Sequence, residues 1–591
     1  MQQATCRRRV VSRLLFFAFT RNRAAAHFER GSIHMTKQAQ FSGEHRQERL
    51  REMAGAPLDL LVIGGGITGA GIALDAQTRG LKTGLVEMQD FGAGTSSRST
   101  KLIHGGLRYL KQLEFKLVAE VGKERAIVYE NAPHVTTPEW MLLPIIERGT
   151  YGKLATSVGL MMYDSLAGVK RNERRIMLSK TETLRREPLL REDKLKGGGY
   201  YVEYRTDDAR LTIETMKAAA DRGALAVNYA KVEELLYEGG KLKGVRVVDM
   251  LSGETYDIFA RKIVNAAGPW VDTIREKDGS KQGKRLHLTK GVHLVIDGGR
   301  FPLKQAIYFD TPDGRMVFAI PRDGKTYVGT TDTNYSGDIV HPRMTTADRD
   351  YILTAANFMF PSLKLTAADV ESSWSGLRPL IHEDGKSPSE LSRKDEIFIA
   401  PSGLITIAGG KLTGYRKMAE RIVNLVTGQL QEQSGGSYPG CTTDRIKLSG
   451  GDVGGSAQFK AFTEAKVRDG EALGLTKRQA ESIVQRYGSN ADLVFQRSTL
   501  LREEAEQTGL PVDVLASLAY GIDEEMVATP QDFFVRRTGA VYFDIAWAQR
   551  WKQPATAYMA KRFGWTPEVA EEHLRRLDVL LHDAATPAAS E

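Results

Sequence analysis

A glycine-rich turn between two apolar strands constrains the fold of this chain more than any other segment. Residues 59–87 read as an apolar strand, a turn, a helix, a second strand and an acid, and the turn has the spacing G-x-G-x-x-G at Gly64, Gly66 and Gly69. This pattern predicts a βαβ unit in which a pyrophosphate lies on the N-terminus of the helix, where free N–H groups attract an anion. Glu87 ends the second strand, where an acid accepts hydrogen bonds from the ribose of an adenosine. The segment therefore predicts a cofactor with an ADP half and leaves open whether that cofactor is NAD or FAD.

The bulk composition indicates a globular protein with more than one core. The chain has 591 residues, of which 41% are hydrophobic and 26% charged, and both values are ordinary for a soluble protein. Its two cysteines, Cys6 and Cys441, exclude a disulfide scaffold and a thiolate metal cluster, and we expect no metal site. No stretch approaches the roughly 18 apolar residues of a spanning helix, so any membrane contact is expected to be peripheral.

The positive charge is concentrated in an N-terminal extension. Residues 1–34 hold seven arginines, no lysine and one acid, so they contribute +6 of the net charge of +9 and leave the rest of the chain close to balanced. A nucleic-acid partner therefore has little electrostatic support, and we expect none. We read this extension as lying outside the fold. We favour a translation start at Met35, with a targeting peptide as the second reading, because the segment is rich in arginine and poor in acids.

The middle of the chain predicts a second, antiparallel sheet interleaved with the nucleotide-binding unit. Residues 138–146, 287–296 and 316–333 read as strands, and the last of these contains a hairpin turn. Short strands also fill residues 222–268, and we expect the apolar strand at their end to return to the nucleotide-binding sheet. A helix is expected over residues 110–130, with apolar side chains on one face.

The last third of the chain changes character. Residues 404–425 again read as strand, Gly-Gly turn and helix, and the positive end of that helix would point at whatever lies above the sheet. Beyond Cys441 the sequence is rich in charged residues and predicts helices. The predicted fold is therefore α/β with α+β elements. We divide it into an extension (1–34), a cofactor domain (35–440) interleaved with a substrate domain (roughly 107–205 and 285–375), and a C-terminal helical domain (441–591).

The number of nucleotide sites helps to decide the cofactor. A flavin reductase that uses NAD(P)H needs a second dinucleotide site, and this chain has one G-x-G-x-x-G that follows a strand. Either NAD reacts alone, or FAD takes electrons from a small molecule. The small-residue loop at 92–106 and the strand-turn-helix at 404–425 favour FAD, because a flavin needs wrapping along its length and a helix end at its pyrimidine. We identify no Cys or His in a covalent-flavin context and predict noncovalent FAD.

Seven motifs in one order give the chain a specific resemblance. They are IGGGITGAG, SSRSTKLIHGGLRYL, NAAGPWVD, IPRDGKTYVGTTDT, SGLRPL, AGGKLTGYRKMAE and DFFVRRTGA, and we judge the match that they define to cover roughly residues 40–580. The chain resembles the FAD-dependent, aerobic, quinone-linked glycerol-3-phosphate dehydrogenases and their oxidase relatives. The resemblance implies that sn-glycerol 3-phosphate is oxidised to dihydroxyacetone phosphate, with hydride transfer to flavin N5 and then electron transfer to a membrane quinone. It also implies a cytoplasmic protein, peripheral at the inner face of the cell membrane, and leaves a homo-oligomer open.

The same motifs contain most of the residues expected to carry the chemistry. A base near neutral pKa must take the hydroxyl proton, which suits histidine; we choose His104 and keep His293 as the second candidate. Arginine and lysine bind phosphate well, and the resemblance points to a phosphate site made of Arg108, Tyr109, Arg378 and Lys411. Catalysis is assigned to His104, Arg378 and Lys411. The ordinary alternatives are that His104 is a core or capping histidine, that Arg108 forms a surface ion pair and that Lys411 caps the end of a strand. Arg322 and Arg393 are weaker candidates for the phosphate site.

The residues expected to contact FAD fall into five groups. The pyrophosphate turn is Gly64, Gly65, Gly66, Ile67, Thr68 and Gly69; the ribose acid is Glu87; the phosphate and flavin are lined by Ser96, Ser97, Thr100, Lys101 and Leu102; the adenosine side is Ala267 and Gly268; and the pyrimidine edge is Leu412 and Thr413.

Three other functions compete with the dehydrogenase. An oxidase of the same fold would pass electrons to O2 and make H2O2, and the sequence does not separate it cleanly from a quinone-linked enzyme. An amine or amino-acid oxidase would need one carboxylate anchor and no cluster of cations. A non-catalytic flavin protein that senses a phosphorylated metabolite would have lost its base, and His104 argues against it.

Overall fold

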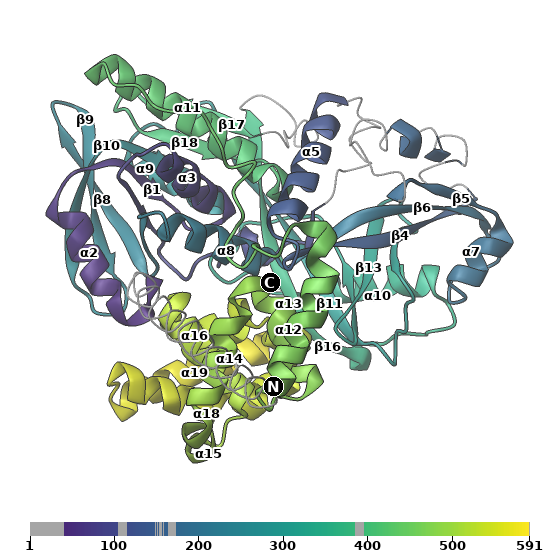
Figure 1. Ribbon diagram of the computed structural model, residues 1–591. Helices are drawn as coiled ribbons and strands as arrows, with labels where there is room; N and C mark the ends of the chain where they lie inside the picture. Colours follow the sequence, from purple (N-terminus) through teal and green to yellow (C-terminus); the bar gives the residue numbers. More distant parts are fainter. Residues whose placement is uncertain are drawn as a thin grey trace, which may run out of the picture.

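The computed structural model describes residues 41–103, 115–147, 149, 152, 156–157, 159–162, 173–383 and 395–589 (Figure 1). These residues form two sheets and a group of helices. Four predicted site residues lie outside the described residues: His104, Arg108, Tyr109 and Arg393. The N-terminal extension 1–34 also lies outside them. No helix among the described residues is long and apolar enough to cross a membrane.

The first sheet is built around a parallel core with β1 in the middle. Its strands, in spatial order, are β17 (Glu396–Ile399), β18 (Ile405–Ala408), β10 (Thr255–Asn265), β1 (Leu58–Ile63), β2 (Thr83–Val86) and β7 (Leu225–Val227). Ile63, at the end of β1, is in register with Val86 on one side and Asn265 on the other. The predicted return of the strand that ends at Asn265 is therefore confirmed. An antiparallel pair, β8 (Ala230–Glu238) and β9 (Lys241–Asp249), extends the sheet from β10.

Helices bury the parallel core. They are α2 (Arg46–Gly55), α3 (Ile67–Thr78), α5 (Phe115–Asn131), α8 (Asp208–Ala220), α9 (Val271–Lys277) and α11 (Tyr415–Ser434). In Figure 1, α3 and α11 lie side by side, and α3 also packs on α8. The buried face of α11 carries Met418, Ile422 and Val423, which is the helical spacing that the sequence predicted.

The second sheet is mostly antiparallel and lies beside the first. Its strands are β3 (Leu102–Ile103), β4 (Thr136–Ile146), β5 (Ile176–Leu178), β6 (Leu195–Thr206), β11 (Lys284–Asp297), β12 (Ala306–Asp310), β13 (Met316–Arg322), β14 (Lys325–Gly329), β15 (Thr333–Asn334) and β16 (Val370–Glu383). The expected hairpin joins β13 to β14, with Arg322 paired to Lys325 across the turn. Helices α7 (Lys180–Arg186) and α10 (Thr346–Met359) pack on this sheet. The interleaving that the sequence predicted is therefore confirmed, while the domain boundaries stay a prediction.

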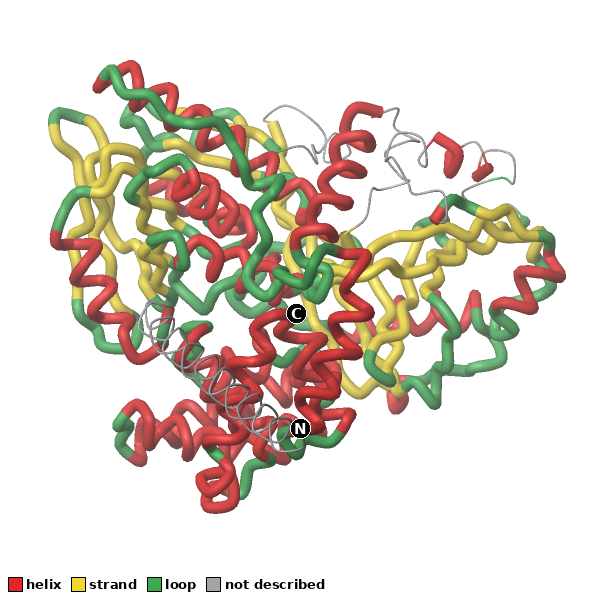
Figure 2. Tube along the Cα trace, viewed as in Figure 1, coloured by secondary structure: helices red, strands yellow, loops and turns green. Residues whose placement is uncertain are grey.

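Helices form the described residues between 456 and 585, as expected. They are α12 (Phe459–Ala472), α13 (Lys477–Tyr487), α14 (Ala491–Leu500), α15 (Arg502–Thr508), α16 (Val512–Glu524), the π-helix η11 (Asp532–Arg537), α17 (Ala540–Phe543), α18 (Ile545–Phe563) and α19 (Pro567–Ala585). Figure 2 shows most of these helices gathered below the two sheets. They have a hydrophobic core of their own and also touch both sheets; for example, the Ser372 hydroxyl on β16 donates a hydrogen bond to the carbonyl oxygen of Tyr542.

Candidate active site

The glycine turn has the close backbone contacts that its spacing predicts. Gly64 follows β1 with φ of +112°, a backbone conformation that favours glycine. A Cβ on Gly69 would lie 1.9 Å from the carbonyl oxygen of Gly64, so only glycine lets α3 approach the turn. Gly66 is the N-cap of α3, and the N–H of Ile67 donates to Ser96 Oγ at 3.0 Å. The remaining N–H groups of the first turn have no partners within the helix, which suits an anion.

Glu87 lies directly beside this turn. One of its carboxylate oxygens accepts from the N–H of Gly65 at 2.6 Å, and the other accepts from the N–H of Gln89 at 2.8 Å. Burial raises the pKa of Glu87, and the two backbone N–H groups oppose that shift. Each carboxylate oxygen can accept a second hydrogen bond, so the group remains able to bind a ribose hydroxyl.

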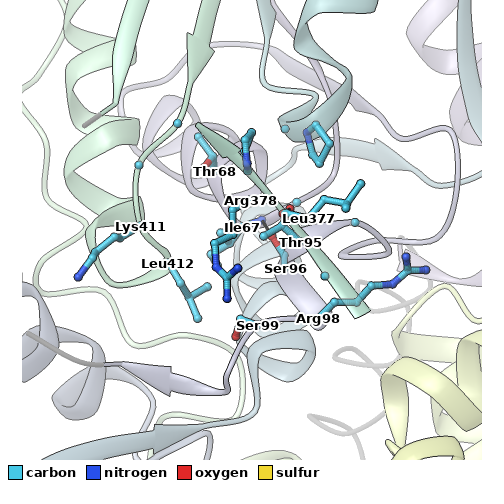
Figure 3. Close-up of a pocket in the computed structure, with 18 of the residues that line it drawn as sticks. Ile67, Thr68, Thr95, Ser96, Arg98, Ser99, Leu377, Arg378, Lys411 and Leu412 are labelled. Carbon is cyan, nitrogen blue, oxygen red and sulfur yellow. Dashed lines mark hydrogen bonds between the residues drawn. The ribbon is translucent and has the colours of Figure 1, made fainter. Parts of the chain in front are cut away.

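A cavity of about 810 Å³ opens at the carboxyl ends of the parallel strands and reaches β11, β13 and β16 of the second sheet (Figure 3). This edge of an open α/β sheet is where ligands usually bind. Fourteen predicted residues line the cavity: Gly64, Gly66, Ile67, Thr68, Glu87, Ser96, Thr100, Leu102, Ala267, Gly268, Arg378, Lys411, Leu412 and Thr413. One cavity thus joins segments that are separated by up to about 350 residues in the sequence.

Four residues expected at the cofactor do not line the cavity. Gly65 and Gly69 act through the backbone contacts described above. Ser97 is buried, and its carbonyl oxygen accepts from Lys101 Nζ at 3.0 Å. Lys101 Nζ also lies 2.6 Å from the carboxylate of Asp208 on α8. The charge of Lys101 is therefore paired with the buried carboxylate of Asp208. The Lys101 side chain stabilises the loop through these contacts and does not face the cavity.

The shape of the cavity fits an extended dinucleotide. The glycine turn and Glu87 form one end, as an ADP half requires. Above Gly268, which has φ of +54°, a Cβ would meet no described atom within 4 Å, so open space continues past the end of β10. Leu412 and Thr413, in the short helix η8 (Leu412–Gly414) before α11, also line the cavity. The residues present therefore fit FAD.

Arg378 places a guanidinium in the part of the cavity formed by the second sheet. It projects from β16, where it is in register with Thr289 of β11. Its NH2 group donates to Thr330 Oγ1 at 2.9 Å, and its NH1 group lies 3.3 Å from the carboxylate of Asp332. A Cβ on Gly291 would lie 2.4 Å from NH2, so a glycine on the neighbouring strand makes room for the guanidinium.

Lys411 enters the cavity from the other side. It lies between β18 and α11, after Gly409 and Gly410, whose φ values of +76° and +85° form the turn. Figure 3 shows its side chain extending away from Arg378, with Leu412 nearer the centre. The two predicted cations thus line one cavity without pointing at one another.

His293, the second candidate for the base, also lines the cavity. Its Nε2 lies 3.1 Å from Thr100 Oγ1, and its ring stacks on Trp374 with centroids 4.7 Å apart. Burial lowers the pKa of His293 well below its usual value, and the charges of Arg378 and Lys101 lower it further. The group is therefore neutral at physiological pH and a weak base. The folded state favours the neutral form of His293, whereas the unfolded chain takes up the proton below about pH 6.5. His293 therefore lowers the free energy of unfolding as the pH falls below that value.

Sequence reasoning missed some residues of the cavity. Asp332 and Thr330 hold Arg378, and both stand in the motif IPRDGKTYVGTTDT, which predicted a hairpin and contributed to the resemblance. Asp332 could have been recognised from its position, because it is a carboxylate that follows the end of β14 by three residues. Arg322, the weaker cation candidate, does not line the cavity, because it binds Asp207 at 2.9 Å and lies over the ring of Phe543.

Comparison with protein families divides the chain into two matched regions. Residues 59–416 match the family model of FAD-dependent oxidoreductases. Residues 441–570 match the model described as the C-terminal domain of alpha-glycerophosphate oxidase. The first match covers more than half of the chain.

Individual relatives are similar over nearly the whole chain. An aerobic glycerol-3-phosphate dehydrogenase from Bacillus subtilis (strain 168) is 62% identical over 548 residues, which is 93% of this chain and 99% of the relative. The crystal structure of a glycerol-3-phosphate dehydrogenase from Bacillus halodurans complexed with FAD is 55% identical, with a TM-score of 0.82 over 93% of this chain and all of that one. An L-alpha-glycerophosphate oxidase from Mycoplasma pneumoniae, at 18% identity and a TM-score of 0.52, covers 66% of this chain and 97% of its own, and shares the fold. With its motifs, its fold and its relatives in agreement, the chain belongs to the family of FAD-dependent, aerobic glycerol-3-phosphate dehydrogenases.

Proposed function

We propose that this protein oxidises sn-glycerol 3-phosphate to dihydroxyacetone phosphate and passes the electrons to a membrane quinone. The observation that carries the proposal is the place of Arg378. A fixed guanidinium lines the same cavity as the dinucleotide turn, at the part reached by the second sheet. A phosphorylated alcohol held there by its phosphate would present its hydroxyl-bearing carbon to the reactive end of the cofactor. The relatives named aerobic glycerol-3-phosphate dehydrogenase support the same substrate.

The residues of the chain would divide the work between cofactor and substrate. Bound FAD supplies the two-electron acceptor for oxidation of the alcohol. The first turn of α3 would bind the pyrophosphate, and Glu87 would bind the ribose. Arg378 would bind the substrate phosphate together with Arg108, Tyr109 and Lys411. Fixing both molecules in one cavity converts an encounter in solution into a reaction between oriented groups.

For the base we propose His104, because the low pKa of His293 makes that residue a weak proton acceptor at neutral pH. We expect His104→Gln to slow flavin reduction by roughly 10²- to 10³-fold, with little change in the substrate concentration that gives half-maximal rate. Anaerobic stopped-flow spectroscopy of flavin bleaching measures both quantities. His293→Gln is the matched comparison, and a larger loss of rate in that variant would exchange the two roles.

The decisive experiment for the proposed function identifies the electron acceptor. We expect the purified enzyme to release far less than one H2O2 per substrate oxidised and to turn over faster when a soluble quinone is added. The second candidate is an oxidase, and it is favoured by the match of residues 441–570 to a domain named for alpha-glycerophosphate oxidase. One H2O2 per turnover, unaffected by quinone, would establish the oxidase instead. Flavin that glycerol 3-phosphate does not reduce would overturn both and favour a metabolite sensor.

We also propose that the protein works on the cytoplasmic face of the cell membrane. A quinone with an isoprenoid tail stays in the lipid, so an enzyme that reduces it must reach the bilayer surface. Sedimentation with liposomes, with and without quinone, tests this attachment. We also propose that the protein forms a homo-oligomer, and light scattering in detergent measures its mass.

A further inference from the structure

The loop that follows β2, residues 87–93, holds the glycine turn in place. In addition to the bond from Gly65 to Glu87, the N–H of Gly92 donates to the carbonyl oxygen of Gly65 at 3.0 Å. The ring of fully buried Phe91 lies so close that a Cβ on Gly65 would be 2.7 Å from it. This loop, called here the ribose loop, therefore cannot shift without moving both the ribose acid and the pyrophosphate turn.

Asp90 anchors the ribose loop to the helical domain. It is completely buried, and its carboxylate accepts two hydrogen bonds from Arg537, at 2.6 Å and 3.0 Å, and another from Arg536. Asn228, just after β7, donates a further bond at 2.9 Å. The two guanidinium groups lower the pKa of Asp90 despite its burial, so the carboxylate stays ionised. A residue three positions after Glu87 is thus held by residues almost 450 positions later.

The arginine pair is itself held firmly. Arg536 donates to Asp532 at 2.8 Å, and Arg537 donates to the carbonyl oxygen of Glu525 at 2.6 Å. Asp532 also accepts from two backbone N–H groups, those of Ala528 and Thr529. The π-helix η11 brings the two consecutive guanidinium groups onto one carboxylate, and π-helical turns occur often at functional sites. The partner of Asp90 is therefore a preformed, rigid group.

We propose that Arg536 and Arg537 are positioning residues for FAD, and that the helical domain is a working part of the cofactor site. They act through Asp90, which fixes the ribose loop, and the ribose loop presents Glu87 and supports the glycine turn. Neither arginine lines the cavity, so both would act on the cofactor only through the loop. Bidentate arginine suits this role because it fixes the direction of a carboxylate as well as its charge.

Asp90→Asn tests the proposal against a matched control. Asp75→Asn breaks an equally buried pair, that of Asp75 with Arg79 at 2.6 Å, which lies in the second half of α3 and does not line the cavity. Both variants should lower the melting temperature of the protein without FAD. In a fluorescence titration with FAD, we expect Asp90→Asn to raise the dissociation constant by about tenfold, as one charged hydrogen bond to a buried group can account for. Asp75→Asn should leave it within about twofold of the wild type.

A conservative variant covers the case in which Asp90→Asn does not fold. Arg537→Lys keeps the charge and loses the fork, so it should fold and still weaken FAD binding by several-fold. With FAD at saturation, the kcat and substrate KM of these variants should match those of the wild type, because the ribose loop lies at the far end of the cofactor from the reaction. FAD dissociation constants that stay at the wild-type value in Asp90→Asn and Arg537→Lys, or that rise equally in Asp75→Asn, would overturn the proposal and leave the arginines as a tie between domains.

Discussion

Replacing Gly69 with alanine is expected to leave the purified protein almost free of flavin. The added Cβ would lie 1.9 Å from the carbonyl oxygen of Gly64, and neither atom belongs to a side chain that could rotate away. Helix α3 would have to move off the glycine turn, and its N-terminal N–H groups would move away from the pyrophosphate. Overpacking at a rigid contact costs about 3 kcal/mol, which corresponds to roughly a hundredfold rise in the FAD dissociation constant. The absorbance ratio of flavin to protein, and a titration with added FAD, measure this loss.

Gly428 supplies the matched control. It lies on the exposed side of α11, and a Cβ there would meet no described atom within 4 Å. Gly428→Ala should therefore keep full flavin content and stabilise the protein slightly, because alanine is the better helix former. Normal flavin content in Gly69→Ala would show that the turn tolerates a displaced helix and would remove the glycine turn from the proposed cofactor contacts.

Arg378→Ala is expected to raise the KM for glycerol 3-phosphate by roughly 10- to 100-fold, the effect of losing a charged hydrogen bond of about 1.5–3 kcal/mol. The guanidinium is held by Thr330 and Asp332, so the wild-type site does not have to order it when substrate binds. The rate with unphosphorylated glycerol should change little, because that substrate lacks the group that Arg378 would bind. Steady-state kinetics with both substrates and a soluble quinone measure the difference.

Two further variants separate charge, geometry and general damage. Arg378→Lys should recover part of the affinity, since lysine keeps the charge and lacks the fork. Arg300→Ala removes an arginine of the same sheet region that pairs with Asp369 at 2.6 Å and does not line the cavity, and it should leave KM unchanged. A KM that is equally insensitive in Arg378→Ala would move the proposed phosphate site elsewhere in the cavity.

Local patterns allowed much of this fold to be predicted. The glycine turn, α3 and β2 are contiguous in sequence, so the spacing of three glycines and one acid was enough to define them. The strand ending at Asn265 and the turn before α11 were recognised because apolar runs end there in small residues. The predicted residues that follow β1, β2, β10 and β18 meet in one cavity because parallel strands present their carboxyl ends on one edge.

Side-chain direction and distant partners could not be predicted in the same way. Lys101 stands among residues that line the cavity, yet its φ of +58° turns it toward Asp208 on α8. The pairing of Arg537 with Asp90 joins two short stretches with no shared pattern, and a buried arginine reads in sequence like an exposed one. Asp332 was overlooked for a similar reason, since its role depends on Arg378 from a different strand.

The strand order of the first sheet sets a limit on when the enzyme can capture its flavin during synthesis. Strands β1 and β2 leave the ribosome early, but β10 and β18 follow roughly 200 and 350 residues later. Until then the nascent chain exposes an apolar β1 with an unpaired edge, which is a template for aggregation. Flavin-starved cells should therefore accumulate insoluble or degraded chains, because the cofactor can act only after β18 has been made and β1 has stood unpaired on one edge for most of synthesis.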